Sequence, residues 1–186
     1  MRKPTEKTVM HSYPGMVALI TAKFNGKSNI MAAGWHSYIS YEPPMYGVAI
    51  GRERYTYELV KKAGSFAVNF LPYEKADFIQ AAGARSGEDV DKFIKGSMKY
   101  DDGITSNAPI LHEAYAAYEC ETVDINSYGD HDWFVGSITQ FYRDDSLFGN
   151  DGLPDFDKLE IPLYLGRSAY AKLDRKSPVN TFRVDD

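Results

Sequence analysis

The pattern that decides the fold lies in residues 16–41, MVALITAKFNGKSNIMAAGWHSYISY. Residues 16–24 are rich in apolar and β-branched side chains, Asn25-Gly26 follows, and a second extended run covers residues 28–41. An Asn-Gly pair between two such runs is the strongest short-range signal for a β-hairpin. We therefore expect two antiparallel strands joined at Asn25-Gly26.

The rest of the chain predicts more strands than helices. Helical spacing is confined to residues 55–95, where helices are expected at 57–63, 73–82 and 89–94. Gly64 and Gly83 are expected to end the first two helices, and Ser86, with an acidic residue three positions later, to begin the third. Strands are expected at residues 45–51, 65–70, 114–126, 132–142, 161–165 and 168–173. Because the helices cluster instead of alternating with strands, the order favours a mainly β fold, a small antiparallel barrel with helical insertions.

Length and composition fit one globular domain. At roughly 150 residues per domain, 186 residues make one domain the default. We expect a single domain over residues 1–186, with a core at about 14–172 and a C-terminal tail at 174–186. Aromatic residues make up 14% of the chain, which favours β structure or a flat ligand.

The charge pattern argues against nucleic acid and membranes as partners. The net charge is −5, and no run of Lys or Arg exceeds two residues. The longest apolar stretch, residues 16–22, is far shorter than a membrane span, and residues 1–15 contain no apolar signal core. We expect a cytoplasmic protein.

The sequence offers no pattern of metal ligands. The single cysteine, Cys120, excludes an intrachain disulfide and a cysteine-rich metal site. The histidines, which show no ligand spacing, are His11, His36, His112 and His131. We expect no metal, and we expect Cys120 to be a small buried hydrophobe because no cation stands beside it in a predicted strand.

Residues 51–56, GRERYT, join a predicted strand to a predicted helix. Unpaired N–H groups at a helix N-terminus carry partial positive charge, and arginines with a threonine hydroxyl would complete a phosphate site there. The alternative is that Thr56 only caps the helix while the arginines are solvated.

Residues 29–35, NIMAAGW, form a β-type run in which small residues replace the usual branched ones. Small side chains let a ligand approach the backbone closely, so this strand could read the edge of a flat heterocycle. The alternative is close strand packing with Trp35 in the core. In the turn Gly129-Asp130-His131, the histidine could supply a proton or contact a ligand, or could simply be exposed in a loop.

Together these stretches resemble the flavin reductase-like family of FMN-binding split barrels, which includes flavoredoxins and flavin-dependent ferric reductases. The resemblance spans residues 14–172 and implies an antiparallel split β-barrel. The segments that carry it are residues 14–21, 29–35, 51–58 (GRERYTYE), 86–93 (SGEDVDKF), 129–131 and 161–166 (IPLYLG).

The resemblance also implies a set of site residues. Those implied along the isoalloxazine ring of FMN are Asn29, Met31, Ala32 and Ala33, with Trp35 in the same cofactor-binding set. Those implied at the ribityl phosphate are Arg52, Tyr55 and Thr56. Those implied to close the cofactor site are Ser86, Gly87 and Phe93. His131 would face the nicotinamide or the electron acceptor and is the candidate catalytic residue.

The activity implied is that of an FMN-dependent oxidoreductase. A homodimer would pass reducing equivalents from NAD(P)H through FMN to free flavin, ferric complexes or a protein acceptor. Glu88 stands where the family often carries arginine, and its charge would repel a 2′-phosphate, which favours NADH. Two alternatives remain: a flavoredoxin-like electron-transfer or flavin-storage protein without nicotinamide activity, and a structural dimer without cofactor.

Overall fold

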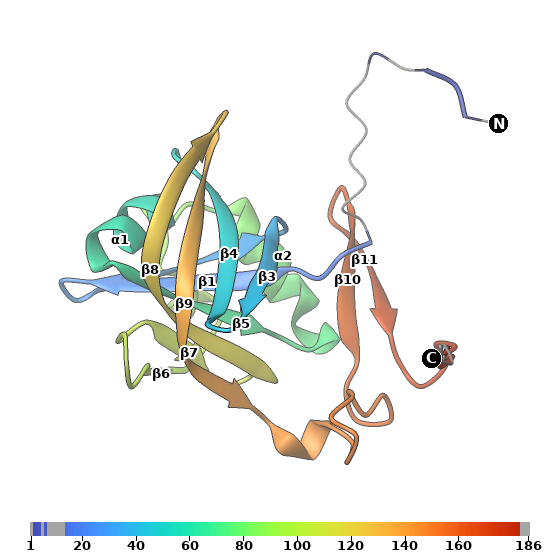
Figure 1. Ribbon diagram of the computed structural model, residues 1–186. Helices are drawn as coiled ribbons and strands as arrows, with labels where there is room; N and C mark the ends of the chain where they lie inside the picture. The colour runs from blue at the N-terminus through green and yellow to red at the C-terminus, as the bar shows by residue number, and fades with distance from the viewer. Residues whose placement is uncertain (1, 5, 7–13, 183–186) are drawn as a thin grey trace.

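Seven antiparallel strands form the main sheet of the computed structural model, which describes residues 2–4, 6 and 14–182. In Figure 1 the sheet curls so that β1 crosses the direction of β8 and β9. The strands, in order across the sheet, are β2 (Lys27–Ala33), β1 (Ala18–Phe24), β5 (Ser65–Phe70), β8 (Ala116–Tyr128), β9 (His131–Arg143), β4 (Pro44–Gly51) and β3 (His36–Tyr41). The predicted mainly β, antiparallel split-barrel architecture is confirmed.

The hairpin at Asn25-Gly26 is confirmed. Both residues have positive φ, 50° and 76°, the backbone form that a tight two-residue hairpin turn requires. Phe24 pairs with Lys27, and the register continues to Ala18 opposite Ala33. The turn chemistry therefore sets the pairing of β1 and β2.

The second extended run is not one strand. It divides at Gly34-Trp35 into β2, which pairs with β1, and β3, which pairs with β4. These consecutive strands end up at opposite edges of the seven-stranded sheet and do not pair with each other. The barrel is consequently split between β2 and β3, and the chain crosses the split at Gly34-Trp35.

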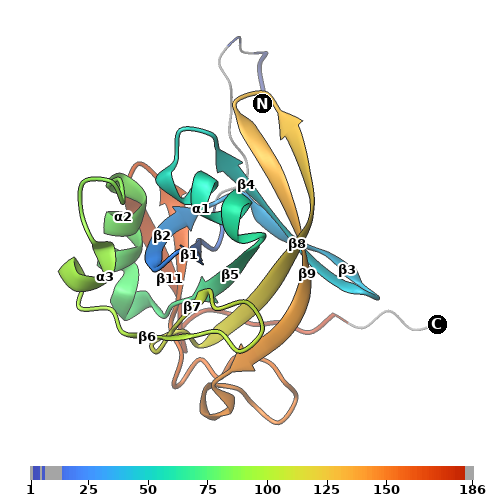
Figure 2. The same ribbon diagram turned by 90° about the vertical axis from the view of Figure 1, so that its left-hand side faces the viewer.

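Helices and short strands fill the connections. The helix α1 (Tyr55–Ala63) ends at Gly64, whose φ of 65° confirms the expected left-handed cap. The remaining elements are η1 (Tyr73–Lys75), α2 (Ala76–Ala84), α3 (Lys92–Lys95), β6 (Tyr100–Asp102), β7 (Pro109–Leu111), η2 (Asp145–Leu147), β10 (Ile161–Gly166) and β11 (Ala169–Leu173). Figure 2 shows α2 and α3 together on one side of the molecule, with β3 on the other.

Several helix boundaries differ from the sequence expectation: α1 begins two residues earlier, at Tyr55, and residues 73–75 form η1 ahead of α2. Two of the differences have a clear physical reason. Gly83 does not end α2, which continues to Ala84; a Cβ at Gly83 would lie 3.1 Å from the Ala32 Cβ, so the glycine lets α2 approach β2 closely. The third helix begins at Lys92, because Asp91 caps it by accepting a 3.0 Å hydrogen bond from the Ile94 N–H.

A buried carboxylate fixes the loop between β6 and β7, a strand pair that the sequence analysis did not identify. The Glu119 side chain is fully buried and accepts hydrogen bonds from the backbone N–H groups of Ile104, Thr105 and Ser106 at 2.7–2.9 Å. The hydroxyls of Thr105, Ser106 and Tyr142 also donate to it. Burial works against ionisation, but these donors prevail and lower the pKa of Glu119 to about 2.

The core has two parts, one enclosed by the sheet and one between the sheet and α2 with α3. The first contains Phe66, Phe134 and Cys120, all fully buried. The burial of Cys120 confirms the expected small buried hydrophobe, and the same burial raises the pKa of its thiol to about 12. His11 and the last four residues of the expected tail lie outside the described residues.

Candidate functional site

Two adjoining hollows lie beside β2 where the barrel is split. The first, of about 130 Å³, we call the cationic pocket; its lining includes Asn29, Arg54, Thr56, Arg85 and Lys92. The second, of about 180 Å³, we call the small-residue groove; it is lined by Met31, Ala32, Ala33, Gly34, Trp35, Ala49, Gly51, Arg54 and His131. Both share Met31, Ala32 and Arg54, so they form one trough.

The N-terminus of α1 opens into the cationic pocket. No side chain caps this helix, and Arg54, Tyr55 and Thr56 at its start all line the pocket. Thr56 Oγ1 accepts a 2.8 Å hydrogen bond from Asn29 Nδ2, which leaves the threonine hydroxyl free to donate to a ligand. Unpaired helix N–H groups, a hydroxyl donor and a guanidinium together suit an anion. Glu53, which also lines the pocket, is paired with Arg54 Nε at 3.1 Å.

Lys92 is a site residue that the sequence analysis missed. Its side chain is 7% exposed, and Nζ donates 2.8 Å hydrogen bonds to the carbonyls of Ile30 in β2 and Ala82 in α2. An ammonium group has three donors, so one remains for the pocket. Burial, with a smaller contribution from Arg54, lowers the pKa of Lys92 to about 8.

The segment Ser86-Gly87 covers the cationic pocket. A Cβ at Gly87 would lie only 2.3 Å from Asn29 Oδ1, so the glycine is needed for the chain to approach Asn29 this closely. Ser86 Oγ accepts a 3.2 Å hydrogen bond from the Glu88 N–H, which stabilises the turn after α2. The structure therefore brings Asn29, Thr56 and Ser86-Gly87 together, although they come from three parts of the sequence.

Trp35 and His131 form the far wall of the small-residue groove. Trp35 is 42% exposed, so the alternative that placed it in the core is wrong. Its ring lies against the His131 ring at a centroid separation of 4.9 Å. His131 Nδ1 is 2.7 Å from Asp130 Oδ1, and this contact lowers the pKa of Asp130. An ionised carboxylate only accepts, so Nδ1 is the protonated nitrogen and Nε2 is left for a ligand.

A third hollow, which we call the aromatic pocket, continues beyond this wall. It has a volume of about 430 Å³ and is lined by Trp35, Ala49, Tyr128, Asp130, His131 and Trp133. It shares Trp35, Ala49 and His131 with the small-residue groove. A planar molecule could therefore lie next to a ligand held in the trough.

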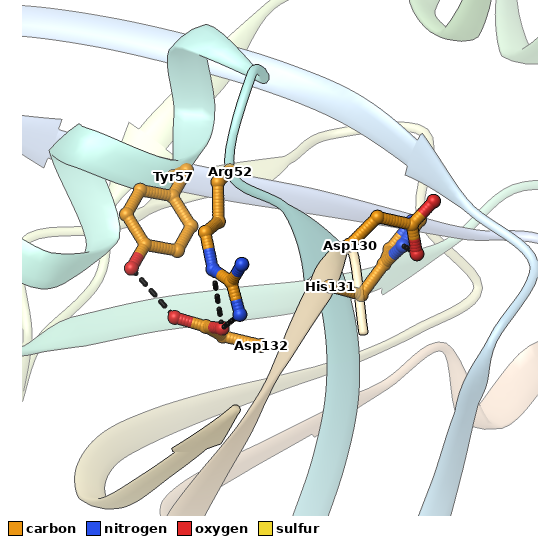
Figure 3. A network of polar contacts seen from close by, with 5 residues as sticks. All are labelled: Arg52, Tyr57, Asp130, His131 and Asp132. Carbon is orange, nitrogen blue, oxygen red and sulfur yellow. Dashed lines mark hydrogen bonds and ion pairs between the residues drawn. The ribbon is translucent and has the colours of Figure 1, made fainter. Parts of the chain in front are cut away.

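Arg52 does not line the trough. Its Nε and Nη2 donate to Asp132 Oδ1 at 2.8 and 2.7 Å, and Tyr57 donates to the other oxygen at 2.7 Å, as Figure 3 shows. These donors lower the pKa of Asp132, which is 4% exposed, to about 2. The network ties the turn after β4 to the start of β9, next to His131.

Phe93 is the other predicted site residue outside the trough. Its ring lies against the Tyr100 ring, with the two centroids 4.6 Å apart, in the part of the core between the sheet and the helices α2 and α3. The other predicted residues all line the trough: Asn29, Met31, Ala32, Ala33, Trp35, Tyr55, Thr56, Ser86, Gly87 and His131.

Within residues 2–4, 6 and 14–182, no three or more His, Cys, Asp or Glu side chains are grouped so that they could hold a metal ion. In the same part of the chain, no helix has the length and apolar character that crossing a membrane requires.

Comparison with known proteins gives the family. The model of the flavin reductase like domain matches residues 10–174. An uncharacterized protein of Aeropyrum pernix is 35% identical over 164 residues; the match covers 84% of this chain and 59% of that one, so the chain spans about three fifths of that relative's length.

Solved structures agree in sequence and in fold. The FMN-binding protein of Thermus thermophilus, determined with bound 1-cyclohex-2-enone, is 32% identical with a TM-score of 0.86, over 97% of this chain and all of that one. The flavoredoxin of Methanosarcina acetivorans is 30% identical with a TM-score of 0.84, over 96% and 95% of the two chains. The matched span includes every residue of the trough, and the chain belongs to the flavin reductase-like domain family.

Proposed function

We propose that this protein is an FMN-dependent oxidoreductase that passes reducing equivalents from NAD(P)H to a small-molecule or protein acceptor. The observation that carries the proposal is the trough, which joins a cationic pocket at an uncapped helix N-terminus to a groove of small residues. The similarity to an FMN-binding protein and to a flavoredoxin supports the same ligand.

The residues of the cationic pocket fit the ribityl phosphate of FMN. Arg54, Arg85 and Lys92 supply cations, and the start of α1 supplies N–H groups and the Thr56 hydroxyl. Because Arg52 is held by Asp132, we propose Arg54 as the arginine of this turn that binds the phosphate. Charge-assisted hydrogen bonds of this kind contribute about 1.5–3 kcal/mol each.

The small-residue groove fits the isoalloxazine ring. Met31, Ala32 and Ala33 lie on β2, an edge strand of the sheet, so the backbone of that edge is open to hydrogen bonding with a heterocycle. Bound FMN would supply the redox chemistry, while the protein supplies binding, orientation and electrostatics.

The aromatic pocket is the place we propose for the nicotinamide or the acceptor. Trp35, Tyr128 and Trp133 can pack against a planar group there. His131 Nε2 is positioned by the Asp130 contact to meet a polar atom of that group or to exchange a proton with it.

The test is an absorption spectrum of the purified protein followed by anaerobic titration with NADH and NADPH. We expect the protein to carry FMN and the nicotinamide to bleach it at a catalytic rate. NADH should be preferred, because Glu88 follows the pocket residues Ser86 and Gly87 and its charge would repel the 2′-phosphate of NADPH. Flavin that binds but is not bleached would instead support a flavoredoxin-like electron carrier, the second candidate, which the similarity to flavoredoxin favours.

We also propose that the chain acts as a homodimer. Large apolar side chains are exposed on β3, at Ile39 and Tyr41, and on β8, at Val123, Ile125 and Tyr128. Exposed apolar surface of this kind marks association surfaces. Light scattering should give twice the mass of the chain, and Val123→Asp should shift the mass toward the monomer; a wild-type monomer would contradict the proposal.

A further inference from the structure

Lys92 lies where two hollows of the structure meet. Its side chain is 7% exposed, and it lines both the cationic pocket and a cavity of about 390 Å³ between α2 and residues 90–98. The two hollows also share Ala82 and Arg85. A small molecule held in the cationic pocket therefore has space beside the Lys92 amine.

The hydrogen bonds of Lys92 suit a neutral amine as well as an ammonium group. Nζ donates to the carbonyl oxygens of Ile30 and Ala82, each at 2.8 Å. A neutral amine has two N–H donors and one lone pair, so these carbonyls engage both donors. The lone pair then takes the direction that the third N–H of the ammonium group would fill. The contacts that position Lys92 for a phosphate thus also position it as a nucleophile.

Lys92 is neutral far more often than an ordinary lysine. Burial, with a smaller contribution from Arg54, lowers its pKa to about 8. About a tenth of the amine is then neutral at pH 7, against roughly 0.03% at the ordinary pKa of 10.5. Acidic residues of the two hollows do not reverse this shift. Glu53 is paired with Arg54 at 3.1 Å, and Glu74 and Asp77 lie near the start of α2, whereas Lys92 meets its end.

We infer that Lys92 is a site of acylation by acyl phosphates, the mixed anhydrides of a carboxylic acid and phosphoric acid. The phosphoryl group occupies the cationic pocket, at Arg54, Arg85 and the start of α1, and the acyl carbon lies beside Nζ. The Nζ lone pair forms a bond to the acyl carbon, and the bond from that carbon to the phosphate oxygen breaks. The amine gives one proton to the departing inorganic phosphate, and an amide remains on Lys92.

Acylation of Lys92 removes a group that the phosphate of FMN uses. The amide has no charge and only one N–H, so one of the two carbonyls, of Ile30 or Ala82, loses its donor. The acyl group has room in the neighbouring cavity, where Ala82 and Met98 offer buried apolar surface. The acylated chain therefore binds FMN more weakly. The inference rests on the proposed phosphate site and adds covalent control of that site.

The test treats the full chain with acetyl phosphate at about pH 7, with and without FMN, and follows acetylation of each lysine by peptide mass spectrometry. Lys95, which is exposed on the same helix α3, is the internal control. We expect Lys92 to react about tenfold faster than Lys95 or more, because the gain in neutral amine outweighs the lower nucleophilicity of a weaker base. Saturating FMN or inorganic phosphate should slow Lys92 about tenfold and leave Lys95 unchanged.

Acetic anhydride, which carries no phosphate, separates recognition from the reactivity of the amine. The preference for Lys92 over Lys95 should be several-fold smaller with the anhydride. An equal preference with both reagents, or no preference with acetyl phosphate, would overturn the inference. So would a lack of protection by FMN that is shown to bind.

The consequence for FMN is measured on Lys92→Gln, which is neutral like the acylated side chain. We expect its dissociation constant for FMN to rise about tenfold and that for riboflavin by about twofold or less, with circular dichroism as the check on folding. Lys95→Gln is the matched control and should leave both constants unchanged within about twofold. An unchanged FMN constant in a folded Lys92→Gln protein would contradict control of the site by acylation.

Two outcomes separate this inference from the proposed function. A protein that binds FMN but whose Lys92 reacts no faster than Lys95 would end the inference and leave the proposed function standing. A protein that binds no flavin but is acetylated selectively at Lys92, with protection by inorganic phosphate, would end the proposed function and leave the acylation site.

Discussion

At the scale of single residues, Arg52 and Arg54 have different roles although they stand two positions apart. Arg52 is held by Asp132 and Arg54 lines both parts of the trough. The turn pattern GRERYT predicts cations near a helix start but does not show which one meets a carboxylate 80 residues away. The family resemblance implied Arg52 at the phosphate, and the local pattern alone does not distinguish Arg52 from Arg54.

Arg54→Ala should weaken FMN binding about 10- to 100-fold and riboflavin binding much less, because riboflavin lacks the phosphate and a charge-assisted hydrogen bond is worth about 1.5–3 kcal/mol. Arg52→Ala is the matched control and should lower thermal stability without selective loss of FMN. Isothermal titration with both ligands measures the difference. The reverse pattern in the two variants would reassign the phosphate to Arg52.

Lys92 predicts a pH dependence of phosphate recognition. Its pKa is lowered to about 8, so the ammonium loses its proton as the pH rises through this value. The preference for FMN over riboflavin should therefore decrease between about pH 7 and 9. In Lys92→Met the preference should be smaller and independent of pH over that interval, with circular dichroism as the check on folding. The same decrease in the variant would exclude Lys92 as the cause.

The burial of Lys92 could not be predicted because the sequence around it is highly charged. The charged residues of the stretch 88–95, EDVDKFIK, are typical of a helix start that is exposed to solvent. Only the packing of β2 against α2 reveals the two carbonyls, Ile30 and Ala82, that bind its ammonium group.

At the scale of elements, the sequence predicts the turns and helix caps that depend only on residues close together in the chain. The turn at Asn25-Gly26 and the cap at Gly64 follow from their own backbone preferences. Gly83 misled the sequence analysis because its role is a tertiary contact with Ala32, and α3 starts late because Asp91 competes successfully for the cap.

Glu119→Gln should destabilise the protein by about 3 kcal/mol at pH 7. The amide has one oxygen fewer for the donors of residues 104–106 and brings a donor of its own into their midst. Urea unfolding measures the loss. Thr105→Val, which removes one hydroxyl donor but keeps the carboxylate, should cost less; an equal cost would show that the carboxylate itself contributes little.

Acid should remove the same stabilisation. The folded-state pKa of Glu119, about 2, lies below its ordinary value of 4.5, so its contribution is complete above pH 4.5 and declines as the pH falls toward 2. The difference in unfolding free energy between wild type and Glu119→Gln should shrink over this interval. A difference that stays constant down to the lowest pH at which the protein folds would contradict the assignment.

At the scale of the whole molecule, the trough exists because the barrel is split. The composition of residues 28–41 predicts an extended chain. It does not predict that β2 and β3 go to opposite edges of the sheet, since this depends on pairing with β1 and β4. The stretch of small residues lines the groove, and close approach of a ligand to its backbone stays a prediction. Its position beside the start of α1 and Ser86-Gly87 is a property of the assembled fold.

The most direct test of the account is an equilibrium titration of the purified, flavin-free protein with FMN and with riboflavin. A trough with three cations around a phosphate predicts one FMN per chain with micromolar or tighter affinity, at least about tenfold stronger than riboflavin. No FMN uptake at saturating concentration, or equal affinity for the two flavins, would contradict it.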